Sequence, residues 1–118
     1  MMAYLLVAVG GALGSLARFI LGREISRKSK GYYPLGTFII NITGAVSLGI
    51  LSAMSLETSL YTLLGDGFLG AYTTLSTFMY EGFSLFHDKR RNAIAYVIGS
   101  LVLGVMGYLT GMGIVRLL

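Results

Sequence analysis

GAYTTLSTF, at residues 70–78, interrupts the third long apolar stretch of this 118-residue chain. It places four Thr and Ser hydroxyls and a glycine where a lipid-spanning helix normally has Leu, Val and Ile. Polar groups at membrane depth are costly unless they face protein or water, and irregular backbone persists there only beside a cavity or inside protein. The run therefore predicts a helix that is broken near residues 73–77 and lines an internal site.

The sequence around this run has the composition of a membrane protein. Its mean hydropathy is +0.78, and 55% of its residues are hydrophobic against 12% charged, which excludes an ordinary soluble domain. A spanning helix needs about 20 mostly apolar residues. The chain has four candidate spans, at residues 3–22, 33–54, 60–86 and 92–117. We therefore predict one all-α transmembrane domain over residues 1–118, small enough that its subunits should associate.

Several kinds of chemistry are excluded by residues that the chain lacks. It has no cysteine, so disulfides, thiol redox chemistry and zinc–thiolate sites are excluded. The single histidine, His87, cannot build a His-rich metal site. No Ser–His–acid arrangement and no phosphate-binding loop is visible. We therefore expect no enzymatic activity. We also expect no nucleic-acid partner, because the basic residues flank the predicted spans.

The cations are divided unevenly between the two sides of the predicted domain. Four spans place the first and third loops on one side, and both termini with the second loop on the other. One side carries eight of the nine Lys and Arg residues, and the other carries Arg116 alone. The eight are Arg18, Arg23, Arg27, Lys28, Lys30, Lys89, Arg90 and Arg91. The positive-inside rule then predicts a multi-pass protein of the plasma (inner) membrane with both termini outside.

Polar side chains inside the second and fourth spans are candidate site residues. Asn41 lies mid-span, with Thr37 one turn earlier on the same face. The Asn41 amide is either an interhelical clamp or a donor to a permeating anion, and the residues alone do not decide between these roles. Tyr96 and Ser100, one turn apart on the fourth span, add two hydroxyls that face one way.

The 70–78 run also allows two interpretations. Its hydroxyls either bond back to their own helix or border an unwound segment. Unwinding would expose carbonyls to a cation and the N-terminus of a half-helix to an anion. Leu75 and Phe78, three residues apart, are either core residues or part of the site. The positive edge of a phenyl ring can solvate a small anion.

Two charged residues lie within or near the spans. Arg18 either extends its charge to the interface from near a helix end or raises the anion potential of a vestibule. Glu81 lies about two-thirds along the third span, and an acid within a membrane is a functional candidate by default.

Three motifs in this order resemble the CrcB/Fluc family of fluoride channels over essentially the whole chain. They are GGALGSLARF at residues 10–19, GTFIINITG at 36–44, and GFLGAYTTLSTF at 67–78, followed by Glu81. Each motif alone is moderately specific, whereas the three together on a four-span chain of this length are highly specific.

The resemblance implies an antiparallel dimer with two narrow fluoride pores at the subunit interface. Such a channel passively exports cytoplasmic fluoride and so relieves its toxicity. The resemblance further implies a structural sodium ion at the dimer centre, held by backbone carbonyls that match Gly70 and Thr73. The family's pore residues match Asn41, Phe78, Tyr96 and Ser100. To the predicted pore we add Leu75, Ser76 and Thr77, and to a predicted vestibule or polar track Arg18, Thr37 and Glu81.

The chain departs from the family pattern in two respects. Leu75 stands where the family commonly has Phe, and leucine has no aromatic edge to offer an anion. A dual-topology homodimer also needs a near-even cation balance, which this chain lacks. We therefore keep two possible partners for the antiparallel dimer: a second copy of the chain or an oppositely oriented paralogue.

Two other functions are weaker interpretations of the same sequence. Small multidrug-resistance exporters also have four spans and form antiparallel dimers, but they rely on a membrane-embedded Glu in the first span and usually on Trp. Here the first span has no acid, the chain has no Trp, and Glu81 is the only candidate proton carrier. A non-transporting scaffold subunit would explain the many glycines but not the polar residues of the later spans.

Overall fold

The computed structural model describes residues 1–29 and 34–118, and all regular structure in these ranges is helical. In chain order the elements are α1 (Met2–Lys28), α2 (Leu35–Ala53), α3 (Thr58–Tyr61), the π-helical η1 (Thr62–Leu69), α4 (Gly70–Tyr72), α5 (Ser76–Asp88) and α6 (Arg90–Leu117). Lys30, counted in the first loop, and Tyr33, expected to begin the second span, lie outside the described residues.

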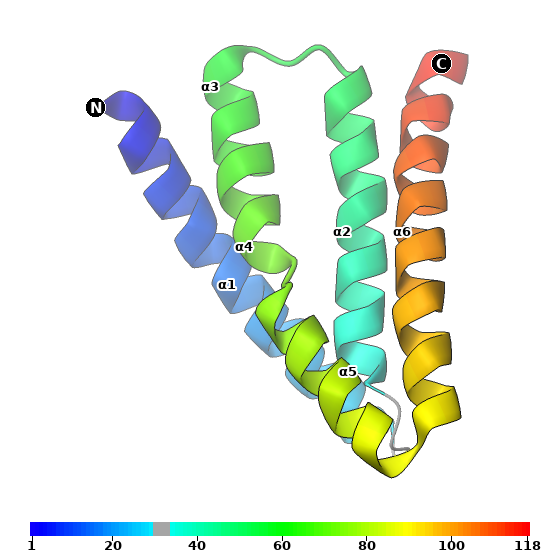
Figure 1. The fold of residues 1–118 in the computed structure, drawn as a ribbon. Helices are drawn as coiled ribbons and strands as arrows, with labels where there is room; N and C mark the ends of the chain where they lie inside the picture. Colours follow the sequence, from blue (N-terminus) through cyan, green and yellow to red (C-terminus); the bar gives the residue numbers. More distant parts are fainter. Residues whose placement is uncertain (30–33) are drawn as a thin grey trace.

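The chain runs back and forth along the long axis of the molecule. α1, α2, the broken segment from α3 to α5, and α6 follow one another in alternating directions, so both termini lie at the same end (Figure 1). The longest dimension is 45 Å, close to the roughly 40–45 Å of a bilayer with its headgroups. α1, α2 and α6 are each long and apolar enough to cross a membrane. The prediction of an all-helical fold is confirmed for the described residues, whereas the predicted span at 60–86 is divided among short helices.

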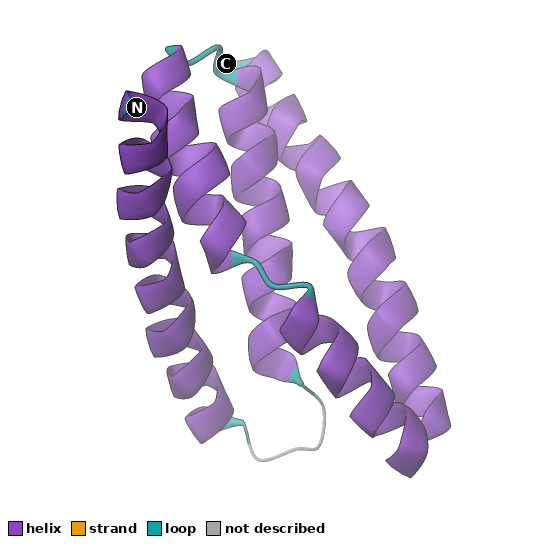
Figure 2. Ribbon diagram, turned by 60° about the vertical axis from the view of Figure 1, so that its left-hand side comes forward, coloured by secondary structure: helices purple, strands orange, loops and turns teal. Residues whose placement is uncertain are grey.

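The predicted break lies between α4 and α5, at residues 73–75 (Figure 2). Thr73 is extended there, with φ −80° and ψ 159°. Its N–H and its hydroxyl both donate to the carbonyl of Leu69, at 3.0 and 2.9 Å, and the helix ends where Thr73 turns to the extended conformation. Ser76 and Thr77 already belong to the first turn of α5. The irregular backbone is therefore shorter than the predicted 73–77.

Glycines allow the closest approaches between helices. A Cβ at Gly14 of α1 would meet the carbonyl of Phe68 in η1, and a Cβ at Gly49 of α2 would meet that of Tyr108 in α6. Small residues at such positions let membrane helices pack backbone to backbone. A Cβ at Gly104 of α6 meets no heavy atom of the described chain within 4 Å. Some glycines thus pack within the subunit, and others stay open.

The buried core is small and joins α5 to α6. Phe78, Leu85, Ala93 and Tyr96 form it, and Tyr96 is fully buried. Most other large apolar side chains face outward, as at Leu13 and Phe83, which are 54% and 62% exposed. Contiguous apolar surface of this kind is covered by lipid or by another subunit.

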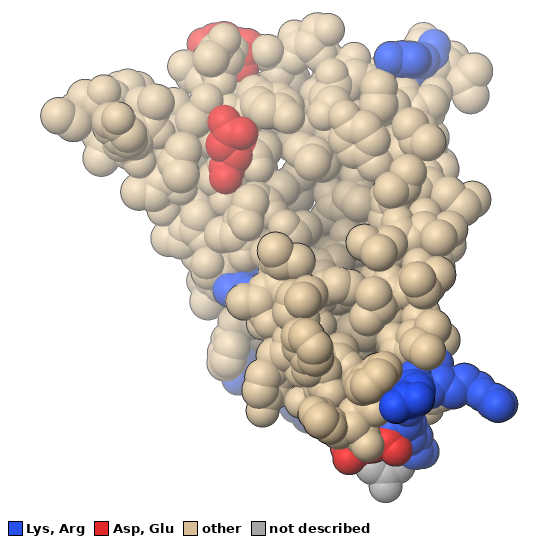
Figure 3. Space-filling model, viewed as in Figure 1, with Lys and Arg blue, Asp and Glu red and all other residues tan. Residues whose placement is uncertain are grey.

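The cations gather at one end of the molecule. Figure 3 shows them where α5 meets α6, and the residues at that turn are the exposed Lys89, Arg90 and Arg91. The exposed Arg27 and Lys28 end α1 at the same end of the fold. The cations that the sequence assigned to one side of the domain therefore lie largely at one end of the folded subunit.

Candidate functional site

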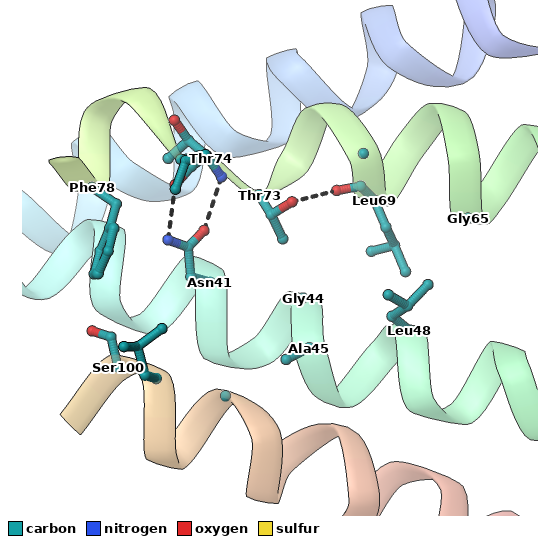
Figure 4. A pocket seen from close by; sticks show the side chains of 14 residues that line it. Asn41, Gly44, Ala45, Leu48, Gly65, Leu69, Thr73, Thr74, Phe78 and Ser100 are labelled. Carbon is teal, nitrogen blue, oxygen red and sulfur yellow. Dashed lines mark hydrogen bonds between the residues drawn. The ribbon is translucent and has the colours of Figure 1, made fainter. Parts of the chain in front are cut away.

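A cleft of about 410 Å³ opens between α2, α6 and the broken segment. The break forms one wall, α2 supplies Asn41 and Gly44, and α6 supplies Ser100 and Gly104 (Figure 4). Phe78 closes the cleft on the α5 side. The residues that interrupt the third apolar stretch thus border an open cleft.

The side-chain amide of Asn41 holds the break. Its Nδ2 donates to the carbonyl of Thr74 at 3.0 Å, and its Oδ1 accepts from the Thr74 N–H at 2.9 Å (Figure 4). The half-buried Asn41 is therefore an interhelical clamp, one of the two roles that the sequence left open. The Nδ2 carries a second hydrogen, so the clamp leaves one donor for another acceptor.

Two backbone donors are diverted from their helical partners at the break. In a continuous α-helix the N–H of Thr74 would donate to the carbonyl of Gly70, and that of Thr77 to the carbonyl of Thr73. Here the Thr74 N–H donates to Asn41 instead, and the Thr77 N–H donates to the Thr74 hydroxyl at 3.2 Å. Carbonyl oxygens released from a broken helix are the kind of ligand that binds Na⁺ in membrane proteins. The carbonyl oxygens of Gly70 and Thr73 are therefore suitable ligands for a sodium ion. Gly70 is exposed.

An aromatic pair and a buried hydroxyl complete the α6 side. The Phe78 and Tyr96 ring centroids lie 5.2 Å apart, with the planes tilted by 42°. The Ser100 Oγ is buried and has no hydrogen-bond partner among the described residues. A buried hydroxyl without a partner is costly, so Ser100 can bind a ligand that enters the cleft. Leu75, at the rim, is 73% exposed.

A second, more polar hollow of about 490 Å³ lies across the break, between α1, α2 and α5. It gathers the residues predicted for the vestibule or polar track, Arg18, Thr37 and Glu81, together with Thr77. The Glu81 Oε1 is buried and unpaired among the described residues. Thr74 lines both this hollow and the cleft. The clamped residue is therefore the partition between the two spaces.

The structure distributes the predicted pore residues unequally. The cleft receives Asn41, Leu75, Phe78 and Ser100, the polar hollow receives Thr77, and Tyr96 packs behind Phe78. Ser76 is exposed and lines neither space.

A second tether of the break was missed from the sequence. The Tyr72 and Thr43 hydroxyls are hydrogen-bonded at 2.9 Å, and the Tyr72 ring stacks on Phe68 with ring centroids 6.0 Å apart. α2 thus holds the chain just before the break, through Thr43, and inside it, through Asn41. Thr43 is separated from Asn41 by two positions and does not share its helix face, so periodicity gave no signal for it.

Comparisons with known proteins agree with these features. The chain matches the family described as CrcB-like protein, Camphor Resistance (CrcB), over residues 5–112. It is 50% identical over 111 residues to the fluoride-specific ion channel FluC 2 of Clostridium acetobutylicum, covering 93% of this chain and 95% of that protein. It is 43% identical over 109 residues to FluC 2 of Moorella thermoacetica, covering 89% of each. It is 37% identical over 114 residues to FluC 1 of Carboxydothermus hydrogenoformans, covering 95% and 92%.

Proposed function

The chain belongs to the CrcB family of ion channels, which are not enzymes, and from this premise we propose that it is a passive, fluoride-selective channel. The relatives that carry this name match it over nearly their full length. The alternative of a proton-coupled exporter is not favoured, because the matching family is a channel family and Glu81 would have to carry the proton alone.

The arrangement around Thr74 is the observation that best supports a pore. Thr74 separates the polar hollow from the cleft. The non-helical backbone at 73–75 leaves polar backbone groups between these two spaces. Irregular backbone at membrane depth is tolerated where it lines such a space. We place the fluoride path from the polar hollow, past Asn41 and Thr74, to Phe78 and Ser100.

The chemistry of these residues suits fluoride better than chloride. Fluoride is small and strongly hydrated, so a narrow dry pore must replace its water with hydrogen-bond donors. The second N–H of Asn41 and the hydroxyls of Thr77 and Ser100 are such donors. The positive edge of the Phe78 ring supplies a further contact. Arg18 in the hollow raises the concentration of anions at the entrance.

A dimer is part of the proposal because one subunit leaves its site open. Leu75 is exposed at the rim of the cleft, and Gly70 is exposed at the break. An antiparallel partner would cover both and create two pores related by the dimer axis. A sodium ion between the subunits would be held by the carbonyls of Gly70 and Thr73, where it would neutralise their partial negative charge.

Passive flow through such a channel is sufficient for fluoride export. Hydrogen fluoride is a weak acid that crosses the membrane and dissociates inside the cell. The membrane potential, negative inside, then drives the anion outward with about 2.3 kcal/mol per charge for each 100 mV.

Transport by purified protein in vesicles tests the proposed class of function. A channel releases fluoride whether or not a proton gradient is imposed, and it leaves organic cations untouched. Uptake of organic cations that depends on a proton gradient would instead identify an exporter. An empty-vesicle control measures the leak of hydrogen fluoride.

A further inference from the structure

Two backbone amides at the break are occupied by side chains rather than by carbonyls. The Thr74 N–H donates to Asn41 Oδ1 at 2.9 Å, and the Thr77 N–H donates to Thr74 Oγ1 at 3.2 Å. Both amides lie four residues after the two carbonyls at which the cation is placed, those of Gly70 and Thr73. The same two hydrogen bonds that interrupt the helix therefore release both of these carbonyl oxygens.

We propose that Asn41 and Thr74 are positioning residues of the cation site: by occupying these two amides, they keep the carbonyls of Gly70 and Thr73 available to a monovalent cation. The inference rests on the proposed function and deepens it, because it links the fluoride path and the cation site through a shared residue. Asn41 then acts on both ions: its N–H donates to fluoride in the pore, and its oxygen holds the Thr74 N–H away from the cation site.

The energetics of helix formation explain why these side chains are needed. An amide left without its side-chain acceptor is costly inside a membrane protein, and its own helical carbonyl lies four residues before it. Loss of either acceptor favours a continuous α-helix through residues 73–75, and that helix consumes the oxygen that would bind the cation. The Thr73 N–H still makes the ordinary helical bond to the Leu69 carbonyl, so the interruption begins only with the amide of Thr74.

The ligand class follows from the charge of the site. Backbone carbonyls are neutral oxygen donors, and none of the described residues forms a cluster of three or more His, Cys, Asp or Glu suited to a metal. Uncharged carbonyls are the ligands that replace the hydration shell of monovalent cations in channels. Divalent ions are usually bound with carboxylates. Sodium is therefore the probe for the site.

The sodium dependence of thermal unfolding tests the proposal without measuring fluoride transport. Thr74→Val removes the hydroxyl at nearly constant volume, and Thr74→Ser retains it. The matched control is Thr110→Val, because the Thr110 hydroxyl donates to the Met106 carbonyl of its own helix α6, at 2.7 Å. Each protein is melted in detergent over a range of sodium concentrations, with choline keeping the ionic strength constant.

We expect the melting temperature of the wild-type protein to rise with sodium, because a ligand stabilises the state that binds it. Thr74→Val should need at least about tenfold more sodium for the same rise, whereas Thr74→Ser and Thr110→Val follow the wild-type curve. A Thr74→Val curve that coincides with the wild-type curve would overturn the inference. A wild-type protein that does not respond to sodium would remove the cation site as well, while leaving the fluoride-flux test untouched.

Amide hydrogen exchange in the wild-type protein covers the case in which Thr74→Val does not fold. Because the coupling is reciprocal, replacing sodium by choline should change the exchange rates at Thr74 and Thr77, whose amides then pass between the side-chain oxygens and the helical carbonyls. Leu85, which lies well inside the regular helix α5, should be unaffected. Equal exchange at Thr74 and Thr77 with and without sodium would contradict the proposal.

Asn41→Asp separates the two roles of Asn41. Aspartate keeps an oxygen that accepts from the Thr74 N–H, which is the bond that the proposal requires. It loses both amide hydrogens, the one donated to the Thr74 carbonyl and the one left for an anion. The variant should retain the sodium-dependent rise in melting temperature and lose fluoride flux. Loss of the sodium response together with the flux would contradict a distinct clamping role for the amide oxygen.

Discussion

Phe78 packs against Tyr96, with ring centroids 5.2 Å apart and ring planes tilted by 42°. Phe78 is in the first turns of α5 after the break, and Tyr96 is fully buried on α6. Edge contacts of this kind add about 0.5–1.5 kcal/mol to the burial of the rings. The pair fixes the start of α5 against α6, so it fixes the wall of the cleft in which Ser100 lies.

Phe78→Leu should reduce fluoride flux by about tenfold or more, since it removes the one aromatic edge that borders the cleft and a tenfold change in rate corresponds to about 1.4 kcal/mol. Leu75→Phe should maintain or raise the flux, because it restores a ring at the rim. Phe83→Leu is the matched control, as Phe83 lies on the same helix and is 62% exposed. An equal loss of fluoride flux in Phe78→Leu and Phe83→Leu would show that the substitutions act through helix packing and not through the cleft.

Gly14→Ala should destabilise the subunit, because the new Cβ would meet the backbone carbonyl of Phe68. The backbone cannot yield as a flexible side chain does, and overpacking costs about 1–3 kcal/mol. Gly113→Ala is the control, since a Cβ there meets nothing within 4 Å in the described chain. Alanine in a helix is favoured over glycine by roughly 1 kcal/mol, so this variant should melt at the same or a higher temperature. Gly14→Ala melting like wild type would refute the close packing of α1 on η1.

Arg18→Gln should lower fluoride conductance most strongly at low ionic strength. The guanidinium lines the polar hollow, and its effect on anion concentration is screened within about 10 Å at 0.1 M salt. Conductance measured from low to high potassium gluconate should show the difference from wild type shrinking. Arg116→Gln, in the last turn of α6 and outside the polar hollow, should leave the conductance unchanged. A deficit that is equal at all ionic strengths would argue that Arg18 acts through structure instead.

A reporter fused to the C-terminus should report one orientation, with the termini outside, because the cations gather at the opposite end. Arg90→Gln combined with Arg91→Gln should increase the inverted fraction. One-sided insertion requires an oppositely oriented paralogue for an antiparallel dimer in cells. Equal inward and outward populations of the wild-type fusion would instead favour pairing with a second copy of the chain.

Hydropathy and hydroxyl placement were sufficient to predict the helical membrane class and the position of the break. Three long apolar stretches became α1, α2 and α6, and the Thr74 hydroxyl accepts from the Thr77 N–H where α5 begins. These features depend on local chain chemistry, which a sequence displays directly. The extent of the break could not be predicted from the sequence, because Ser76 and Thr77 are compatible with both helix and irregular backbone. The hydrogen bond from the Thr77 N–H to the Thr74 hydroxyl places them in the helix.

Contacts between distant segments were the part that the sequence could not supply. Asn41 had two equally supported roles, and only the position of the Thr74 backbone, 33 residues later, makes it a clamp. The bond between Thr43 and Tyr72 depends on the same packing of α2 against the break. The separation of Thr77 from Phe78 into two spaces likewise follows from the rotation of α5, which no spacing rule determines.

Anion efflux from liposomes tests the central claim most directly. The purified wild-type protein is reconstituted from detergent, which imposes no sidedness and so permits antiparallel pairing. Efflux is followed with fluoride- and chloride-selective electrodes. We predict rapid release of fluoride with retention of chloride, and fluoride release reduced to the level of empty liposomes for Asn41→Asp. No fluoride release by the wild-type protein, equal release of chloride, or intact fluoride release by Asn41→Asp would contradict a fluoride pore built around Asn41 and the break.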